Sequence, residues 1–407
     1  MKKRTAAIIG AGPAGLAAAC AAAAAGHDCV VFEQLSSPGA KLLASGGGKC
    51  NVTNILGKED FAAKFGSKWR FMLPALNDFF GETLLDFFSD RGVRLVASDG
   101  FHYFPETEKA RDVLKMFLNE INSAGGRIKC SAKVSSLIIE NGNIKGIRLS
   151  DETEFAADAV IIAAGGKSYP ALGGRGAGYL LAESAGHKVT ELFPAMTGVH
   201  AAETWVHECA GISLPDVIAY IDLPKWRKNQ FRGELLFTHN GFSAFAILDM
   251  AGSVAELLTK NPTVPLRINF TPCATRDEWA NRFSSWRQKN GIKKIVSLLS
   301  EYLPRKVAAA LVGDSDIIAA RLRGSDQEIL LEKLLDCPFT LVATDSWDRA
   351  MVTQGGVSLK DISPDTLESK LVRGLYFAGE VLELTGPCGG YNITWALASG
   401  MLAGSLR

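Results

Sequence analysis

The sequence lacks the patterns that mark several common classes of protein. Its 407 residues include eight cysteines but no CxxC pair, so neither a zinc site of usual spacing nor a dithiol motif is expected. No apolar run approaches the roughly 20 residues that a membrane-spanning helix needs. Basic and acidic residues nearly cancel, 44 against 43. We therefore expect a cytoplasmic protein of two or three domains, with reduced cysteines, no metal and no membrane partner.

A glycine-rich segment near the N-terminus matches the dinucleotide-binding fingerprint. An apolar run at residues 6–9 leads into Gly10-Ala11-Gly12-Pro13-Ala14-Gly15 and an alanine-rich stretch, and a second apolar run ends at Glu33. In such a unit Gly10 makes the tight turn, Gly12 admits a pyrophosphate, and Gly15 lets the helix pack on the strand. The Glu33 carboxylate would accept hydrogen bonds from a ribose, which favours an adenosine ribose without the 2′-phosphate of NADP.

Two other interpretations of this segment are weaker. A chance glycine-rich turn would not explain Ala19 and Gly26, which stand where helix and strand must pack closely. The basic start at residues 2–4 and the apolar stretch after it also imitate a secretory signal peptide. Gly12 and Pro13 would interrupt the apolar core of that signal, and the chain continues directly into the strand that ends at Glu33.

A second glycine-rich segment spans residues 41–54, and we expect neither a helix nor a strand there because its glycines are too many. A loop of this kind exposes backbone amides, which suit a phosphate or the edge of an isoalloxazine ring. An ordinary flexible surface loop is the alternative interpretation.

The following segments indicate which dinucleotide is bound. Apolar runs at 134–139 and 144–149 flank Asn141-Gly142, a hairpin turn signal, and a buried run at 158–163 then ends in Gly165-Gly166. A βαβ start, a β-meander and a strand that ends in small residues are more typical of a glutathione-reductase-type FAD domain than of an NAD-binding Rossmann domain.

The far end of the chain supplies the second half of such a domain. Residues 374–377 predict a short buried strand before Glu380, whose carboxylate would accept hydrogen bonds from ribityl hydroxyls. Gly389-Gly390-Tyr391-Asn392 then begins a final helix that ends near Leu406. A helix N-terminus aimed at the flavin N1/O2 edge would stabilise negative charge on the reduced flavin. A helix that merely begins at glycines and is capped by asparagine is the alternative.

These segments together predict an α/β fold, a two-part glutathione-reductase-type FAD-binding Rossmann domain with an inserted β-barrel-like and helical region. FAD is the expected cofactor, and its contacts are expected from the fingerprint, the second glycine-rich segment, the meander and the C-terminal segment. The expected contact residues are Gly10, Gly12, Pro13, Ala14, Gly15, Glu33, Gln34, Lys41, Leu42, Ser45, Gly46, Gly47, Asn51, Val134, Ala164, Gly165, Gly379, Glu380, Gly390, Tyr391, Asn392 and Ile393.

Six motifs spread nearly from end to end carry a family resemblance. They are SGGGKCNVTN at 45–54, GGKSYP at 165–170, GELLFTH at 233–239, GGV at 355–357, and FAGE at 377–380 with GGYN at 389–392. In these motifs the chain resembles the BaiN/RdsA (YhiN-like) flavoproteins. The resemblance implies bound FAD and a discontinuous FAD domain. Members of that family are associated with reduction of unsaturated bile-acid intermediates, oxidation of aminoacetone and dihydrouridine synthesis in ribosomal RNA.

We expect substrate choice to reside in an insertion at residues 191–340. The expected FAD domain comprises 1–190 and 341–407. Within the insertion, 191–272 and 324–340 are expected to be β-rich, and 273–323 helical.

The insertion also concentrates positive charge. Residues 225–306 hold 14 Lys or Arg against 6 Asp or Glu, an excess of eight in a chain of net charge +1. Basic and aromatic residues alternate at 225–232 and 282–294. Basic side chains neutralise phosphates and aromatic faces stack on bases, so RNA, ribosomal RNA included, is a candidate partner beside a small-molecule substrate. Solvated basic faces with buried aromatics are the simpler alternative.

Cys50 and His239 are the candidates for catalysis. Disulfide reductases of this superfamily keep a dithiol near the position of Cys50, but Ile55 stands where the second thiol would be. Cys50 is therefore either a lone thiol acid near the flavin or a buried structural thiol. His239 is expected to contact substrate or to act as acid or base. The family usually has Gly-Pro where this chain has Ala244-Phe245, in a loop expected near the flavin.

The leading hypothesis is an FAD-dependent oxidoreductase that takes hydride from NAD(P)H and reduces an electron-poor C=C bond, in its sharpest version uracil in ribosomal RNA. Because no second dinucleotide fingerprint is present, NAD(P)H would bind transiently or in a site without the usual sequence signature. A small-molecule reductase and an amine oxidase are alternatives within the family. A non-catalytic RNA-binding module stabilised by FAD is the alternative from another class.

Overall fold

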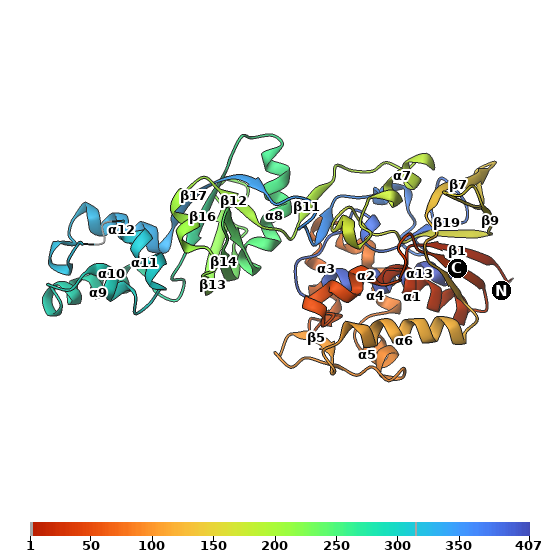
Figure 1. Cartoon of the computed structure of the whole chain (residues 1–407), viewed down its shortest axis with the longest axis horizontal. Coiled ribbons are helices and arrows are strands. Elements are labelled where there is room, and N and C mark those ends of the chain that lie inside the picture. The colour runs from red at the N-terminus through yellow and green to blue at the C-terminus, as the bar shows by residue number, and fades with distance from the viewer. Residues whose placement is uncertain (1–2, 314–315) are drawn as a thin grey trace. The chain divides into compact units, whose positions relative to one another are not determined.

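The computed structural model describes residues 3–313 and 316–407, and the chain forms two compact units (Figure 1). The first unit comprises Met1–Phe193 and Val352–Arg407, and the second comprises Pro194–Met351. Residues 1, 2, 314 and 315, which the predicted FAD domain and the predicted helical part include, lie outside the described residues. Each unit has its own hydrophobic core.

A five-stranded parallel sheet forms the centre of the first unit, in the order β19-β10-β1-β2-β6. Its strands are β1 (Thr5–Ile9), β2 (Asp28–Phe32), β6 (Arg127–Lys129), β10 (Ala159–Ile162) and β19 (Leu375–Phe377). The central strands are apolar and buried over residues 6–9 and 159–162, as expected for parallel strands that are covered on both faces. Since β19 comes from the C-terminal segment, the two ends of the chain share one sheet.

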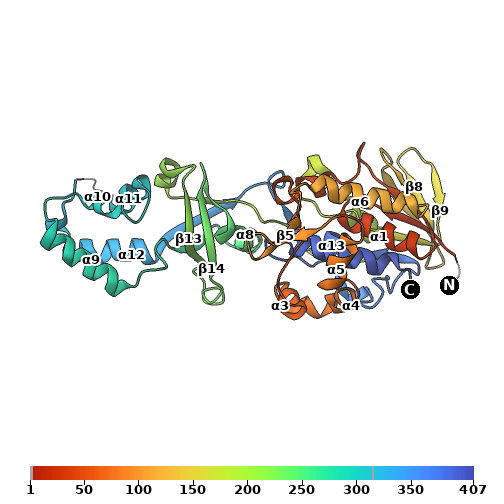
Figure 2. The same ribbon diagram turned by 90° about the horizontal axis from the view of Figure 1, so that it is seen from below.

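Two helices from opposite ends of the chain lie side by side in this unit, α1 (Pro13–Ala24) and α13 (Tyr391–Gly404) (Figures 1 and 2). Their backbones approach closely because α13 has glycines at the contact. A Cβ atom at Gly400 would lie 2.3 Å from the Ala14 carbonyl oxygen. A third helix, α6 (Ala110–Ser123), also packs against α1.

The meander expected after residue 133 is present in the first unit. Its strands are β7 (Val134–Glu140), β8 (Asn143–Leu149) and β9 (Glu154–Ala156). Asn141 and Gly142 both adopt positive φ, 49° and 72°, as a two-residue hairpin turn requires. A second small sheet has the order β3-β5-β4, and short helices complete the unit. Their bounds are β3 (Thr53–Asn54), β4 (Leu95–Val96), β5 (His102–Pro105), α2 (Ala40–Ala44), α3 (Lys58–Ala63), α4 (Leu73–Asp78), α5 (Glu82–Ser89) and α7 (Ala177–Ser184).

The second unit is built on a closed six-stranded barrel in the order β12-β15-β14-β13-β16-β17. Its strands are β12 (Val199–Ala201), β13 (Ser213–Ile221), β14 (Phe231–Phe237), β15 (Gly241–Ser243), β16 (Val264–Asn269) and β17 (Cys337–Thr344). Burial alternates along β16, so every second side chain enters the barrel core. The helix α8 (Phe245–Leu258) packs against β14. This helix lies within residues 191–272, which were predicted to be β-rich.

The described residues of the second unit also form the helices α9 (Arg276–Lys289), α10 (Ile295–Leu299), α11 (Arg305–Val312) and α12 (Ser325–Leu335). A capping box starts α9, in which the Thr275 side chain accepts from the Glu278 amide and the Glu278 side chain accepts from the Thr275 amide. Trp279, Phe283 and Trp286 of α9 are buried in the core.

The predicted fold class is confirmed, with two corrections of detail. The stretch 324–340 is not β-rich as a whole, because α12 occupies 325–335 and buries Leu330, Leu331 and Leu334 at helical spacing. The predicted boundary at 341 falls inside β17, which pairs with β12 as far as Thr344. The chain leaves the first unit within β11 (Phe193–Ala195) and re-enters it at the first residue of β18 (Val352–Gln354).

Candidate FAD site

The turn between β1 and α1 has the geometry that a pyrophosphate site requires. Gly10 has φ +100°, a conformation that L side chains rarely adopt, and a Cβ atom on Gly15 would lie 1.9 Å from the Gly10 carbonyl oxygen. By contrast, a Cβ atom on Gly12 would meet nothing within 4 Å. Pro13 opens α1 without losing a helical hydrogen bond. The first and third glycines therefore serve packing, and Gly12 leaves open space at the helix N-terminus for an anion.

Glu33 stands at the end of β2 as predicted, and its carboxylate is held by the backbone. It is 8% exposed, and it accepts hydrogen bonds from the amides of Ala11 and Leu35, each at 2.8 Å. Two carboxylate oxygens have more lone pairs than these two donors use, so a ribose hydroxyl can still be bound. The Ala132 amide donates to the Glu33 carbonyl at 2.8 Å, which brings the segment before Val134 alongside.

The second glycine-rich segment is more regular than predicted. Residues 40–44 form the short helix α2, a 3₁₀ turn covers Ser45–Gly48, and Thr53–Asn54 form β3. The prediction that this segment contains neither a helix nor a strand was wrong. The glycines begin only after α2, so they do not prevent that helix. Gly46 and Gly47 adopt left-handed conformations, with φ 57° and 66°. The Ser45 hydroxyl donates to the Leu42 carbonyl at 2.6 Å, which ties the turn to the helix.

Lys41 and Glu380 form the charged centre of the site, although 339 residues separate them. Lys41 Nζ lies 2.7 Å from Glu380 Oε2 and donates to the Ser168 hydroxyl at 2.7 Å. The other carboxylate oxygen, Glu380 Oε1, accepts from the Thr353 amide at 2.9 Å and from the Ser168 hydroxyl at 3.2 Å. Only 26% and 17% of the two charged side chains are exposed, so the pair is partly desolvated.

The turns beside this pair bring three of the predicted residues together. Gly165 follows β10 with φ +69°, and a Cβ atom there would lie 4.0 Å from Glu380 Oε2. Gly379 has φ +77°, and a Cβ atom there would be 2.7 Å from Cβ of Ala14. Ser168 and Thr353 were not among the predicted contact residues, although the GGKSYP motif contains Ser168.

The turn that begins α13 is fixed by several polar contacts. Gly390 has φ +85°, and a Cβ atom there would lie 2.8 Å from backbone atoms of Thr53. The Asn51 side chain, oriented to satisfy both neighbours, donates to the Thr53 carbonyl at 3.0 Å and accepts from the Gly390 amide at 3.2 Å. Asn54 Nδ2 donates to the Gly389 carbonyl at 2.9 Å. Glycine is thus required at 390 because the β3 backbone lies directly against it.

The first turn of α13 is held in the same way. The Asn392 side chain donates to the Gly386 carbonyl and accepts from the Gly386 amide, both at 2.9 Å. The ring of Tyr391 is buried and stacks on Phe61, with centroids 4.9 Å apart. Ile393 is half-buried in the same turn. This rigid turn presents the α13 N-terminus, whose partial positive charge suits the negative charge of a reduced flavin.

The two predicted catalytic residues lie in different environments. Cys50 is fully buried, and desolvation raises the pKa of its thiol to about 12, which keeps it protonated. Of the two interpretations of Cys50, this burial favours the structural thiol. His239 is exposed in the turn between β14 and β15 of the second unit. Ala244 follows β15 with φ 73° and ψ −177°, a region that glycine alone adopts without strain.

A half-buried histidine that was not among the predicted residues lies against the α13 turn. His102 Nδ1 is 2.7 Å from Asp99 Oδ2, and a Cβ atom on Gly389 would lie 3.2 Å from His102 Nε2. No motif marks this pair, since His102 reaches the turn only through the pairing of β5 with β3.

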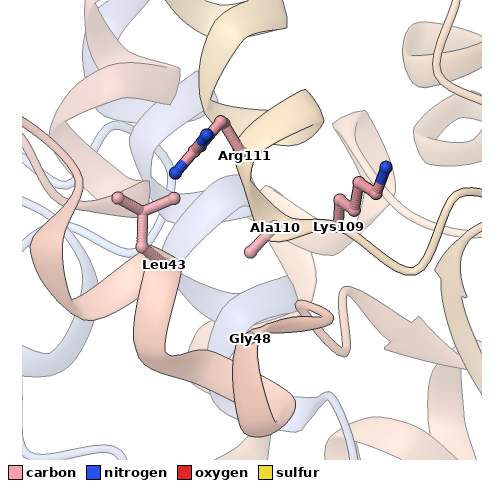
Figure 3. Close-up of a pocket in the computed structure, with 5 residues that line it drawn as sticks. All are labelled: Leu43, Gly48, Lys109, Ala110 and Arg111. Atoms are coloured by element: carbon pink, nitrogen blue, oxygen red, sulfur yellow. The ribbon is translucent and has the colours of Figure 1, made fainter.

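A cavity of about 390 Å³ lies between the second glycine-rich segment and the start of α6. It is lined by Leu43 and Gly48 from that segment and by Lys109, Ala110 and Arg111 from the start of α6 (Figure 3). Its lining residues are not among those predicted to bind the cofactor. Lys109 and Arg111 are exposed, so the cavity is a surface depression with two cations at its rim.

The predicted stacking of aromatic and basic residues in the second unit is only partly possible. Phe283 and Trp286 are buried in the core, so they offer no face to a base. Trp226 is half-buried, while Lys225 and Lys228 beside it are exposed. Surface basic residues therefore remain available to phosphates, but for 282–294 the structure supports the simpler interpretation of solvated charges over buried aromatics.

The site as a whole fits FAD. Open space at Gly12 suits the pyrophosphate, the fixed carboxylate of Glu33 suits a ribose, and Lys41 with Glu380 suits the polyhydroxyl chain of a flavin. Among the described residues, no helix is both long and apolar enough to cross a membrane.

Comparisons with known proteins agree with this assignment. The family model described as HI0933-like protein Rossmann domain matches residues 4–406. The 3-dehydro-bile acid delta(4,6)-reductase of Clostridium scindens is 32% identical, over 98% of this chain and 97% of that protein. The ribosomal RNA dihydrouridine synthase of Haemophilus influenzae is 31% identical, over 96% and 95%. Among solved structures, a 3-ketosteroid delta1-dehydrogenase from Sterolibacterium denitrificans shares the fold, with TM-score 0.54 and 11% identity over 100% of this chain and 99% of that one.

Proposed function

The chain belongs to the HI0933-like Rossmann-domain family of FAD-dependent oxidoreductases, and on that premise we propose that it reduces an electron-poor C=C bond, with uracil in ribosomal RNA as its substrate. The observation that carries the proposal is the agreement between the geometry of the site and the names of the related proteins. The site fits FAD, and the bile-acid reductase and the two ribosomal RNA dihydrouridine synthases are each named for a substrate or product of C=C reduction.

In this proposal the first unit holds the cofactor. The turn at Gly12 binds the pyrophosphate, Glu33 the adenosine ribose, and Glu380 the ribityl hydroxyls, while Lys41 fixes the Glu380 carboxylate. When bound, FAD supplies the hydride chemistry, and the protein supplies binding, orientation and electrostatics. The α13 N-terminus stabilises the charge that develops on reduction.

Reduction of uracil to dihydrouracil adds a hydride at one carbon of the C=C bond and a proton at the other. We propose NAD(P)H as the hydride source, which binds transiently. The buried thiol of Cys50 is poorly placed to supply the proton, since its side chain has no accessible surface. His239 is exposed and stays the proposed substrate-contacting acid or base of the second unit.

Two features bear on the choice of substrate. Ribosomal RNA is favoured by the exposed lysines Lys225, Lys228, Lys289 and Lys293 and by two curated relatives named ribosomal RNA dihydrouridine synthase. A small unsaturated molecule is the second candidate, favoured by the bile-acid reductase among the relatives and by the burial of Phe283 and Trp286.

Mass spectrometry of ribosomal RNA tests the proposal. In a strain that lacks the gene, we expect a dihydrouridine of the wild-type RNA to appear as uridine, and a plasmid copy of the gene to restore it. Unchanged dihydrouridine would leave the small-molecule reductase. Anaerobic mixing with NADH and NADPH separates both candidates from a module in which the flavin is structural, because neither donor would bleach a structural flavin.

A further inference from the structure

We propose that His102, held by Asp99, is a cationic contact of the flavin at the Gly389-Gly390 turn and raises the reduction potential of the cofactor. This inference rests on the FAD site of the proposed function and deepens it. In this inference a charged side chain stabilises the reduced cofactor together with the helix N-terminus.

The position of His102 is set by backbone pairing. β5 pairs with β3 so that His102 stands opposite Asn54, and the Asn54 side chain donates to the Gly389 carbonyl. The imidazole therefore lies on the strand pair that supports the α13 turn. A Cβ atom on Gly389 would lie 3.2 Å from His102 Nε2 and 3.3 Å from Cε2 of Tyr391, so Nε2 faces this turn directly.

Asp99 keeps the imidazole oriented. Its Oδ2 lies 2.7 Å from His102 Nδ1, and its Oδ1 accepts the backbone amides of His102 and Phe101 at 2.7 and 2.8 Å. The backbone and ring hydrogen bonds from His102, followed by that from the Phe101 amide, lower the pKa of Asp99. Asp99 therefore stays ionised, and as the acceptor at Nδ1 it is the partner that the proposed cationic ring needs, a ring in which Nε2 is also a donor.

With the ring cationic, as proposed, the two charges of this pair would not cancel at the turn. The side chain of Asp99 is 50% exposed and thus well screened by solvent, whereas that of His102 is 23% exposed. The ring also packs edge to face against Phe101, with centroids 4.8 Å apart. The His102 ring, the positive end of the proposed pair, is the less exposed of the two side chains and faces the turn. Its charge would therefore add to the positive potential of the α13 N-terminus.

Measurement of the midpoint potential tests this role without turnover. The holoprotein would be titrated anaerobically against a reference dye, as wild type and as His102→Gln, His102→Arg and Asp99→Asn. For His102→Gln we expect the ratio of reduced to oxidised flavin at a given potential to fall about tenfold, or about 30 mV for a two-electron couple. His102→Arg keeps the charge and should stay within about threefold of wild type, and Asp99→Asn should lie between.

The matched control is His207→Gln, an exposed histidine of the second unit, which should leave the potential unchanged. An unchanged potential in His102→Gln would overturn the inference, as would an equal fall in His102→Arg, since a merely structural role would not distinguish charge. If wild-type protein retains no FAD, the proposed function itself fails. If FAD is held and shifted as expected but ribosomal RNA is not modified, only the substrate assignment fails.

Discussion

At the scale of single residues, Glu380 shows how a site forms from distant parts of the chain. Its carboxylate is engaged by Lys41, Ser168 and the Thr353 amide at once. A charge in such a network is costly to remove, because Lys41 would keep a partly buried charge without its partner.

We predict that Glu380→Gln weakens FAD binding by at least about tenfold, since a charged hydrogen-bond acceptor contributes about 1.5–3 kcal/mol. Quenching of FAD fluorescence on titration of the apoprotein measures this affinity. Glu383→Gln is the control, because its carboxylate pairs with Lys68 at 2.6 Å, outside the network of Lys41 and Glu380. Equal FAD affinity in wild type and Glu380→Gln would show that the network is not part of the site.

Ala244 is the clearest case of local strain in the second unit. Its φ of 73° with ψ of −177° belongs to a region that is essentially restricted to glycine and costs an alanine about 1–3 kcal/mol. We predict that Ala244→Gly raises the free energy of unfolding of this unit by about 1 kcal/mol, measured by urea denaturation. Ala255→Gly, within α8, should lower it by a similar amount. A decrease in stability in Ala244→Gly would contradict the strain.

At the scale of elements, different glycines of the β1–α1 turn serve packing and cofactor binding. Gly15 is needed for the fold, because a Cβ atom there would meet the Gly10 carbonyl oxygen, whereas Gly12 faces open space. We predict that Gly12→Ala leaves the melting temperature of the apoprotein near wild type but abolishes retention of FAD. Gly15→Ala should lower the melting temperature of the apoprotein by several degrees. Thermal scans and FAD content after gel filtration check both, and a Gly12→Ala protein with full FAD content would refute the assignment.

Sequence patterns predicted elements well where a local signal exists. The fingerprint, the meander and the final helix each follow from glycine spacing, alternation or a hairpin turn, and the structure has all three. The prediction failed at residues 325–335, which form α12 although the stretch was predicted to be β-rich. Leu330, Leu331 and Leu334 stand there at helical spacing, so a local signal was present and was missed.

The site was predictable to the same extent. Gly12, Glu33 and Glu380 were predicted to bind the cofactor because they stand in motifs, and their role stays a prediction. The contacts of Glu380 with Ser168 and Thr353, and the approach of His102 to Gly389, depend on strand register and on turns far apart in the sequence. The sequence could not decide whether Cys50 is a thiol acid or a structural thiol. Its burial favours the structural thiol, because the side chain is inaccessible.

At the scale of the whole molecule, a nearly neutral chain concentrates an excess of positive charge in residues 225–306. In the loop between β13 and β14, Arg227 is paired with Asp222, and in the strands themselves Arg232 of β14 is paired with Asp216 of β13, whereas Lys225 and Lys228 of the loop are exposed. The surface that is left for a polyanion is therefore smaller than the count of basic residues suggests.

We predict that Lys225→Glu with Lys228→Glu weakens binding of ribosomal RNA and lowers the slope of log affinity against log salt concentration by about two, one for each phosphate that is no longer neutralised. Filter binding at several salt concentrations measures the slope. Lys260→Glu is the control, because Lys260 is paired with Glu256 at the end of α8. An unchanged slope in the double variant would place the RNA elsewhere or remove it as the substrate.

The central claim, an FAD-dependent reduction of uracil in ribosomal RNA, is tested most directly by reconstitution. The purified holoprotein would be incubated anaerobically with NADPH or NADH and ribosomal RNA from a strain that lacks the gene, and nucleosides from the digested RNA would be analysed by mass spectrometry. We predict that one uridine gains two hydrogen atoms, that the gain requires both protein and nicotinamide, and that it does not occur with Gly12→Ala. RNA that stays unmodified while NADPH or NADH bleaches the flavin would contradict the claim and assign the reductase to a small-molecule substrate.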